Sequence, residues 1–157
     1  MTPQEIHACL KAQFGDAIGD WRAPETGDAW VDVVSNRLHD VGRFLREAPE
    51  LEFDFLRLIT GVDRGESLSS VYHLYSYTHF HEITLRVDTP RAAPYVPSVA
   101  NLWAAAEWHE REAYDMIGII YEGHPALTRI LLPEDWDGYP LRKDYEAPKD
   151  YHGLTNE

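Results

Sequence analysis

The sequence predicts an α+β fold, with a largely antiparallel or mixed sheet, helices packed on it, and an extended C-terminal segment. The chain has 157 residues, of which 44% are hydrophobic, so it can bury one core. Apolar residues recur with helical spacing in some stretches and alternate with strand spacing in others. After Pro133 this periodicity is lost. We therefore expect a folded domain over residues 1–132 and an extended segment over residues 133–157.

The first part of the chain predicts a helix, a hairpin and a second helix. Residues 3–14 are expected to form a helix, with Thr2 as its N-cap and Gly15 at its end. The stretch DWRAPETGDAWVDV predicts a hairpin whose turn lies at residues 24–28. Residues 36–48 predict a second amphipathic helix, because apolar side chains recur on one side.

The middle of the chain predicts strands and then a longer helix. FDFLRLITGVDRG and SVYHLYSY predict two strands joined by a turn at residues 63–65, and EITLRVDT predicts another strand. The proline-rich stretch RAAPYVPSVA is expected to be a connection. Ser98 is the expected N-cap of a helix over residues 99–117, which ends before Gly118.

Composition limits the classes of function. A net charge of −13 repels phosphate backbones and anionic lipid headgroups, so nucleic-acid binding is not expected and any membrane association should be indirect. The one cysteine, Cys9, excludes a disulfide framework and an all-cysteine metal or iron–sulfur site built by this chain alone. MTPQEIHACLKAQFG lacks the pattern of a secretory signal, and the apolar runs are too short to span a membrane. These features predict a protein on the cytoplasmic side.

The stretch AEWHEREAYDMIGIIYEGHPALTRIL carries several partial motifs, none of which is complete. His109 begins a sequence like the zinc-protease helix, but position 113 is alanine instead of the second histidine. Gly118 and Gly123 have the spacing of a phosphate-binding loop, but His124 follows where lysine is required. No catalytic, cofactor-binding or metal-binding residue is therefore predicted from this stretch.

Three histidines elsewhere leave a metal site open. His73, His79 and His81 share strand parity, so they could share one face of a sheet if the strand were unbroken. A break near residues 78–81 would remove that arrangement. An independent metal-dependent hydrolase is therefore kept as a minor alternative.

Helical spacing also places Glu107, Arg111 and Asp115 on one face of the predicted helix. One hypothesis is a solvent-exposed charge ladder, in which each pair contributes roughly 0.2–0.5 kcal/mol. The other is that Glu110 and Glu112, which lack partners within the helix, meet basic groups of another chain. The spacing alone favours the ladder.

The stretch PSVANLWAAAEWHEREAYDMIGIIYEGHPALTRILLPEDWDGYPLRKDY resembles the C subunit of the proton-pumping NADH–quinone oxidoreductase, respiratory complex I or NDH-1. The shared elements are E-R-E-x-Y-D at residues 110–115, then G-I, G-H-P and R-I-L, and the ending P-E-D-W…G-x-P-L-R-K-D-Y at residues 133–145. LRLITGVD and VYHLYSY also resemble the family, so the similarity spans residues 30–145. Thr128 departs from it, because a basic residue is expected there. If that position makes an interface ion pair in relatives, this chain has lost or moved it.

The resemblance implies a non-catalytic subunit of the hydrophilic arm that packs against the large quinone-site subunit and supports assembly. Electron transfer from NADH to quinone and proton translocation would belong to the whole complex, and the isolated chain would be inactive. FMN, iron–sulfur clusters and quinone would be bound by other subunits, and this chain would bind none. The expected location is peripheral, on the cytoplasmic side of the inner membrane. The alternative is the equivalent subunit of a membrane-bound hydrogenase or of an F420H2 or ferredoxin–quinone oxidoreductase.

The ending after Pro133 is the expected partner-docking segment. Its aromatic rings can each bury on the order of 150–250 Å², and an arginine beside such rings is typical of interface hot spots. We expect this segment to lie across the quinone-site subunit, with Arg142 making a charge-assisted contact there. Folding back on its own domain is the alternative. The candidate interface residues are Glu110, Arg111, Glu112, Asp115, His124, Arg129, Trp136, Tyr139, Arg142, Lys143 and Tyr145.

Overall fold

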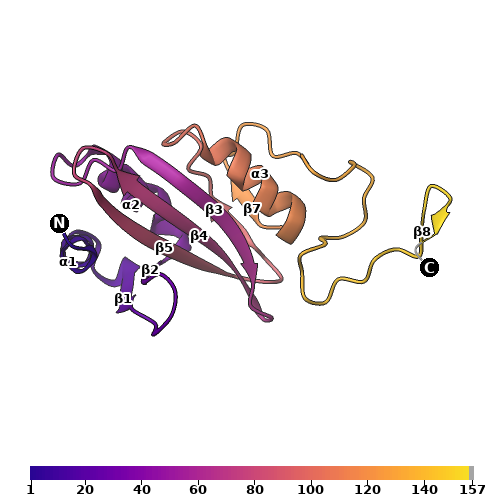
Figure 1. Ribbon diagram of the computed structural model, residues 1–157, viewed down its shortest axis with the longest axis horizontal. Helices are drawn as coiled ribbons and strands as arrows, with labels where there is room; N and C mark the ends of the chain where they lie inside the picture. The colour runs from indigo at the N-terminus through magenta and orange to yellow at the C-terminus, as the bar shows by residue number, and fades with distance from the viewer. Residues whose placement is uncertain (156–157) are drawn as a thin grey trace.

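A five-stranded mixed sheet forms the centre of the computed structural model, which describes residues 1–155 (Figure 1). The strand order is β1-β2-β5-β4-β3, in which β2 and β5 run parallel and the other neighbours run antiparallel. Helices pack on this sheet, so the predicted fold class is confirmed. The strands are β1 (Ile18–Arg22), β2 (Trp30–Val33), β3 (Phe55–Asp63), β4 (Ser67–Ser76) and β5 (His81–Pro90).

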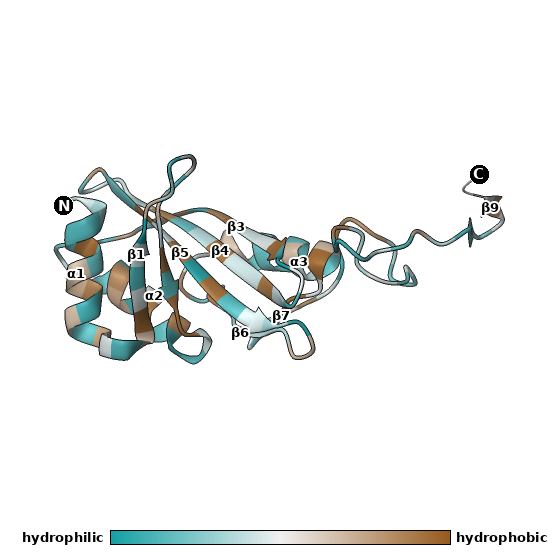
Figure 2. Ribbon diagram, turned by 90° about the horizontal axis from the view of Figure 1, so that it is seen from below, coloured by the Kyte–Doolittle hydropathy of each residue, from teal (hydrophilic) through white to brown (hydrophobic). Residues whose placement is uncertain are grey.

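Three helices share one hydrophobic core with the inward-facing side chains of the sheet. Along β4, Leu68, Tyr72 and Leu74 belong to this core, whereas Val71, His73 and Tyr75 point to the opposite face. In Figure 1 α2 lies behind the sheet, and Figure 2 shows hydrophobic residues as brown bands on helices and strands. The helices are α1 (Pro3–Phe14), α2 (Leu38–Glu47) and α3 (Ala106–Ile117).

The N-terminal elements agree with the sequence. The hydroxyl of Thr2 accepts a hydrogen bond from the backbone N–H of Glu5 at 3.3 Å, and the Glu5 carboxylate accepts from the Thr2 N–H at 2.7 Å. This capping box fixes the start of α1, as predicted for Thr2. The predicted hairpin is the antiparallel pair β1–β2. Short 3₁₀ turns follow α1 (η1, Gly15–Ala17) and precede α2 (η2, Ser35–Arg37).

The predicted start of the third helix is wrong. The helix begins at Ala106, and residues 99–105 form turns instead. The reason is the carboxylate of Glu110, which accepts hydrogen bonds from the Ser98 hydroxyl and the Val99 N–H and so holds that segment outside the helix. The predicted end is correct, since Gly118 has a left-handed φ of 82°.

The proline-rich connection contains a strand that the sequence does not predict. β6 (Tyr95–Pro97) pairs in parallel with β7 (Ile120–Glu122), which directly follows α3. Each strand has three residues, which is too short for an alternating pattern to be recognised. This pair packs in the core through Val96 and Tyr121.

Residues 129–155, here called the C-terminal arm, extend away from the sheet beyond α3 (Figure 1). Its only regular structure within the described residues is a small hairpin of β8 (Asp150–Tyr151) and β9 (Leu154–Thr155). The chain after Pro133 is therefore mostly extended, as the sequence predicts. Up to residue 155, the chain contains no helix with the length and apolar character that a membrane crossing requires.

Candidate partner-binding site

The C-terminal arm is fixed to the end of α3 by Asp115, a fully buried residue in the last turn of the helix. Its Oδ2 accepts hydrogen bonds from the backbone N–H groups of Ile130, Leu131 and Leu132 at 3.0, 2.7 and 3.0 Å. Burial by itself raises the pKa of Asp115, but these bonds and the adjacent Arg129 outweigh it and lower the pKa below its usual value. The carboxylate is therefore charged at neutral pH and orders the first residues of the arm.

Arg129 closes the arm into a loop. Its guanidinium donates to Oδ1 of Asp115 at 2.9 Å and to the carbonyl oxygens of Trp136 and Gly138, both at 3.1 Å. Only 13% of its side chain is exposed. The Asp115–Arg129 pair therefore sets the shape of the arm as well as its attachment, because one cation bridges residues that the sequence separates.

A second part of the arm returns to the C-terminal end of α3. The backbone N–H of Leu141 donates to the carbonyl of Met116 at 3.0 Å, and Arg142 Nε donates to the carbonyl of Ile117 at 2.7 Å. These carbonyl groups belong to the last turn of α3. Carbonyl groups at that end of a helix have no hydrogen-bond partner within the helix itself. A Cβ added at Gly118 would lie 2.6 Å from the ring of Tyr139, so a glycine is needed where the arm crosses.

Two guanidinium groups lie over the ring of Tyr139. The guanidinium carbon of Arg142 is 4.5 Å from the ring centroid, and that of Arg129 is 5.4 Å away. Cation–π contacts of this kind stabilise partly buried arginines. The predicted combination of arginine and aromatic residues is therefore present, but its members contact one another within this chain.

A third attachment joins the arm to the sheet. Asp63, buried at the end of β3, accepts hydrogen bonds from Arg91 at 2.7 Å and from the backbone N–H of Lys143 at 2.8 Å. Arg91 also pairs with Asp144 of the arm. The bond from Arg91 is the main reason that the pKa of Asp63 lies far below its usual value.

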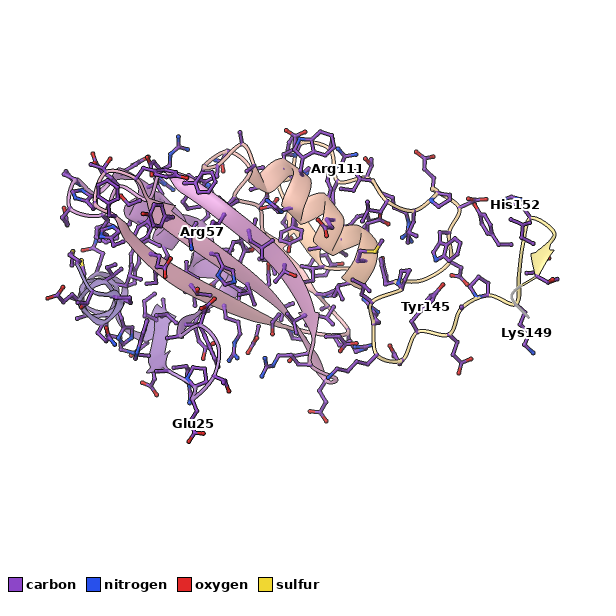
Figure 3. The ribbon with its side chains drawn as sticks, viewed as in Figure 1. Glu25, Arg57, Arg111, Tyr145, Lys149 and His152 are labelled. Atoms are coloured by element: carbon purple, nitrogen blue, oxygen red, sulfur yellow. The ribbon has the colours of Figure 1, made fainter. Side chains whose placement is uncertain are left out.

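The outer part of the arm is organised around Trp136. Its indole N–H donates to the hydroxyl of Tyr145 at 3.0 Å, and its ring lies 5.0 Å from that of Tyr151. Figure 3 shows Tyr145 in the arm, well beyond α3. The aromatic rings are thus partly buried by the arm itself. Two strongly exposed apolar groups of the arm are Leu131, at 60%, and Leu141, at 61%, which the sequence does not single out.

Two predictions about α3 need correction. Glu110 does not present its carboxylate to another chain, because it is fully buried and bonded to Ser98 at 2.6 Å and Val99 at 2.7 Å. Burial raises the pKa of Glu110 to about 7. The charge ladder is also absent, since Asp115 pairs with Arg129 and Arg111 is turned elsewhere.

Arg111 bonds to the segment before the arm. Its guanidinium donates to the carbonyl of Thr128 at 3.2 Å and to the Thr128 hydroxyl at 3.0 Å, and the guanidinium carbon lies 4.9 Å from the ring centroid of Trp108. Thr128, where the resemblance leads one to expect a basic residue, thus accepts hydrogen bonds from Arg111 within this chain. Glu112 remains exposed on the helix.

The predicted interface residue His124 has a local role, and the sheet separates two histidines of the possible metal site. His124 bonds to the carbonyl of Glu107 at 3.0 Å and accepts from the N–H of Ala126 at 3.0 Å, which closes the turn after β7. His73 and His81 lie on opposite faces, because β4 ends at Ser76 before β5 begins. Among the described residues, no three histidine, cysteine or carboxylate side chains are grouped as metal ligands.

Comparison with known proteins gives consistent matches. Residues 31–151 match the family described as the respiratory-chain NADH dehydrogenase 30 kDa subunit. The C subunit of the NADH-quinone oxidoreductase of Chloroherpeton thalassium is 43% identical, and the match covers 97% of this chain and 65% of that protein. The same subunit of a Roseiflexus species is 50% identical, with 86% and 79% covered. The chain thus spans just under two thirds of the Chloroherpeton relative and more of the Roseiflexus relative.

Solved structures agree with the fold. Nqo5, determined as a trypsin-resistant fragment, is 28% identical with a TM-score of 0.64, and the match covers 78% of this chain and 98% of the fragment. A chain of the membrane-bound sulfane sulfur reductase, an archaeal respiratory membrane complex, is 22% identical with a TM-score of 0.73, and the match covers 91% of this chain and 85% of that chain. The second likeness concerns the fold alone.

Proposed function

The chain belongs to the respiratory-chain NADH dehydrogenase 30 kDa subunit family, and from this we propose that it is the C subunit of a proton-translocating NADH–quinone oxidoreductase. In this proposal it is a hydrophilic-arm subunit without catalytic residues of its own. It binds the large quinone-site subunit, supports assembly of the complex, and reaches the cytoplasmic side of the membrane through its partners. The names of the relatives favour this complex over a hydrogenase or a ferredoxin-linked oxidoreductase.

The structure of the C-terminal arm is the main support for the docking role. Its backbone is held by buried charged groups of the domain, yet the side chains of Leu131 and Leu141 are largely exposed. Ordered backbone with exposed apolar side chains is typical of an interaction surface. Because Asp115 and Arg129 fix the arm before a partner arrives, less conformational entropy is lost on binding.

The arginines of the arm already have hydrogen-bond or aromatic partners within this chain. A bound partner would therefore add mainly apolar contacts. Arg129 and Arg142 already have carbonyl, carboxylate or aromatic partners. We therefore propose that these arginines shape the surface and that the leucines supply its apolar contacts. FMN, iron–sulfur clusters and quinone are proposed to be bound by other subunits, as expected for a chain with one cysteine.

A co-purification experiment tests the docking role. A tagged chain replaces the native one in its host, and the amount of quinone-site subunit recovered with it is measured by mass spectrometry. The variants Leu131→Ser and Leu141→Ser should each reduce this recovery about tenfold, since a lost hot spot costs about 1–2 kcal/mol or more. Val34→Ser is the matched control, because Val34 is 51% exposed but lies between β2 and η2, outside the C-terminal arm.

A truncation after Leu132 separates docking from folding. The shortened domain should unfold cooperatively in urea but fail to recover its partner. If it is unfolded, the segment is part of the domain's own core instead of a docking arm. If the leucine variants recover as much partner as wild type, the arm is not the contact surface.

A further inference from the structure

The outer face of the sheet, which lies opposite the core, also exposes apolar side chains. Core side chains from the helices and from β6–β7 lie on the inner face. Antiparallel register places the outward residues of β3 directly beside those of β4, for example Phe55 beside Tyr75. In Figure 1 this face is seen in front of α2.

Apolar side chains follow β3 along this face. Phe55, Leu58 and Val62 are 40%, 39% and 36% exposed, although β3 is a strand of a well-formed sheet. Val71 of β4 lies beside them and is half-buried. Exposed apolar side chains gathered along one strand of an outer face are typical of a surface that another protein covers.

An aromatic cluster lies at one end of this stripe. The ring of Tyr77 is 5.3 Å from that of Phe55 and 5.0 Å from that of Tyr75. The guanidinium carbon of Arg57 lies 4.7 Å from the Tyr75 centroid, and Figure 3 shows Arg57 over the strands. Tyrosine and arginine are the residue types that dominate binding energy at protein interfaces.

Charged side chains that β2, β3 and β5 contribute to the outer face are paired with one another. Arg86 lies 2.7 Å from Asp32 and 3.4 Å from Asp88, and Arg57 lies 2.7 Å from Glu82. Although the chain carries a net charge of −13, these groups largely neutralise each other. An apolar partner can therefore cover the face without leaving one of these charges unpaired, whereas a charged lipid surface gains little from it.

We propose that this outer face is a second contact surface, covered by an apolar, weakly charged surface of the same protein that the C-terminal arm binds. The proposal rests on the proposed function, because it uses the same partner. One partner can cover both surfaces, because the outer face and the C-terminal arm adjoin each other. A hollow between β3 and α3 is lined by Thr60 and Gly61 on one side and by Met116 and Leu141 on the other. The exposed leucine of the arm thus adjoins the apolar stripe.

The same co-purification assay tests this proposal in the assembled complex. Phe55→Ser and Tyr77→Ser in the full-length chain should each reduce the recovered partner about tenfold, as for a hot-spot residue. Tyr95→Ser is the matched control, because Tyr95 is 48% exposed but lies on β6, on the inner side of the sheet. Its recovery should equal that of wild type.

Oxidative footprinting of the wild type gives a readout that does not depend on variant folding. Tyr75 and Tyr77 should be modified at least about fivefold more slowly in the complex than in the isolated chain, since a covered ring is shielded from solvent radicals. Unchanged modification rates would overturn the proposal. So would a dimer of the isolated chain that Phe55→Ser abolishes, because the occupant would then be a second copy. If the wild type itself recovers no partner, the proposed function fails instead.

Discussion

Replacing Asp115 by asparagine should release the C-terminal arm from α3. The carboxylate is fully buried, accepts three backbone N–H groups and neutralises Arg129, whose side chain is 13% exposed. Removing one member of a buried ion pair typically costs about 3–5 kcal/mol. Arg129 keeps its bonds to the carbonyls of Trp136 and Gly138, so we expect the lower end of that range, about 3 kcal/mol.

Hydrogen exchange measures this loss where it occurs. The amides of Ile130, Leu131 and Leu132 should exchange on the order of a hundredfold faster in Asp115→Asn, because local opening free energy sets their protection. Asp144→Asn is the control: Asp144 also pairs with an arginine, but 70% of its side chain is exposed, so its loss should stay within about 1 kcal/mol. Equal protection in Asp115→Asn and wild type would refute the assignment of Asp115 as the anchor.

Two further substitutions test the interior and the surface of α3. Burial raises the pKa of Glu110 from 4.5 to about 7, so the folded chain binds this proton more tightly than the unfolded chain and loses stability as the pH rises through that window. Glu110→Gln, which does not titrate, should gain about 3 kcal/mol relative to wild type between pH 4 and pH 8 in urea unfolding; a pH-independent difference would contradict it. Arg111→Ala should lose only about 1 kcal/mol, because its bonds to Thr128 are solvent-accessible. A loss of several kcal/mol in the isolated chain would show that Arg111 supports the core.

Local patterns predict most of the fold. Thr2 and Gly15 mark the two ends of α1, because helix capping depends on a few adjacent residues. The strands β3 and β4 are recognisable because each is long enough to show strand-forming residues between turn signals. The parallel pairs β2–β5 and β6–β7 are not predicted. Their partners are far apart in sequence, and no local pattern specifies which strands become neighbours.

The site is harder to predict because spacing along a helix does not give the environment of a side chain. Glu110 and Asp115 both look like surface residues in the sequence, yet the fold buries both of them. Helical spacing pairs Asp115 with Arg111, one turn away, whereas its partner is Arg129, which the chain brings back after β7. The basic and aromatic character of the arm is visible in the sequence, but the exposure of Leu141 depends on the arm's path.

The parallel pairing of β2 with β5 also determines when the fold can form during synthesis. Val31 of β2 pairs with Leu85 of β5, so the N-terminal hairpin cannot join the sheet until β5 has left the ribosome. Contacts between distant residues form slowly, because a long loop must close first. Until then the exposed edge of β2 is open to incorrect pairing, and nascent chains are most at risk of aggregation in this interval.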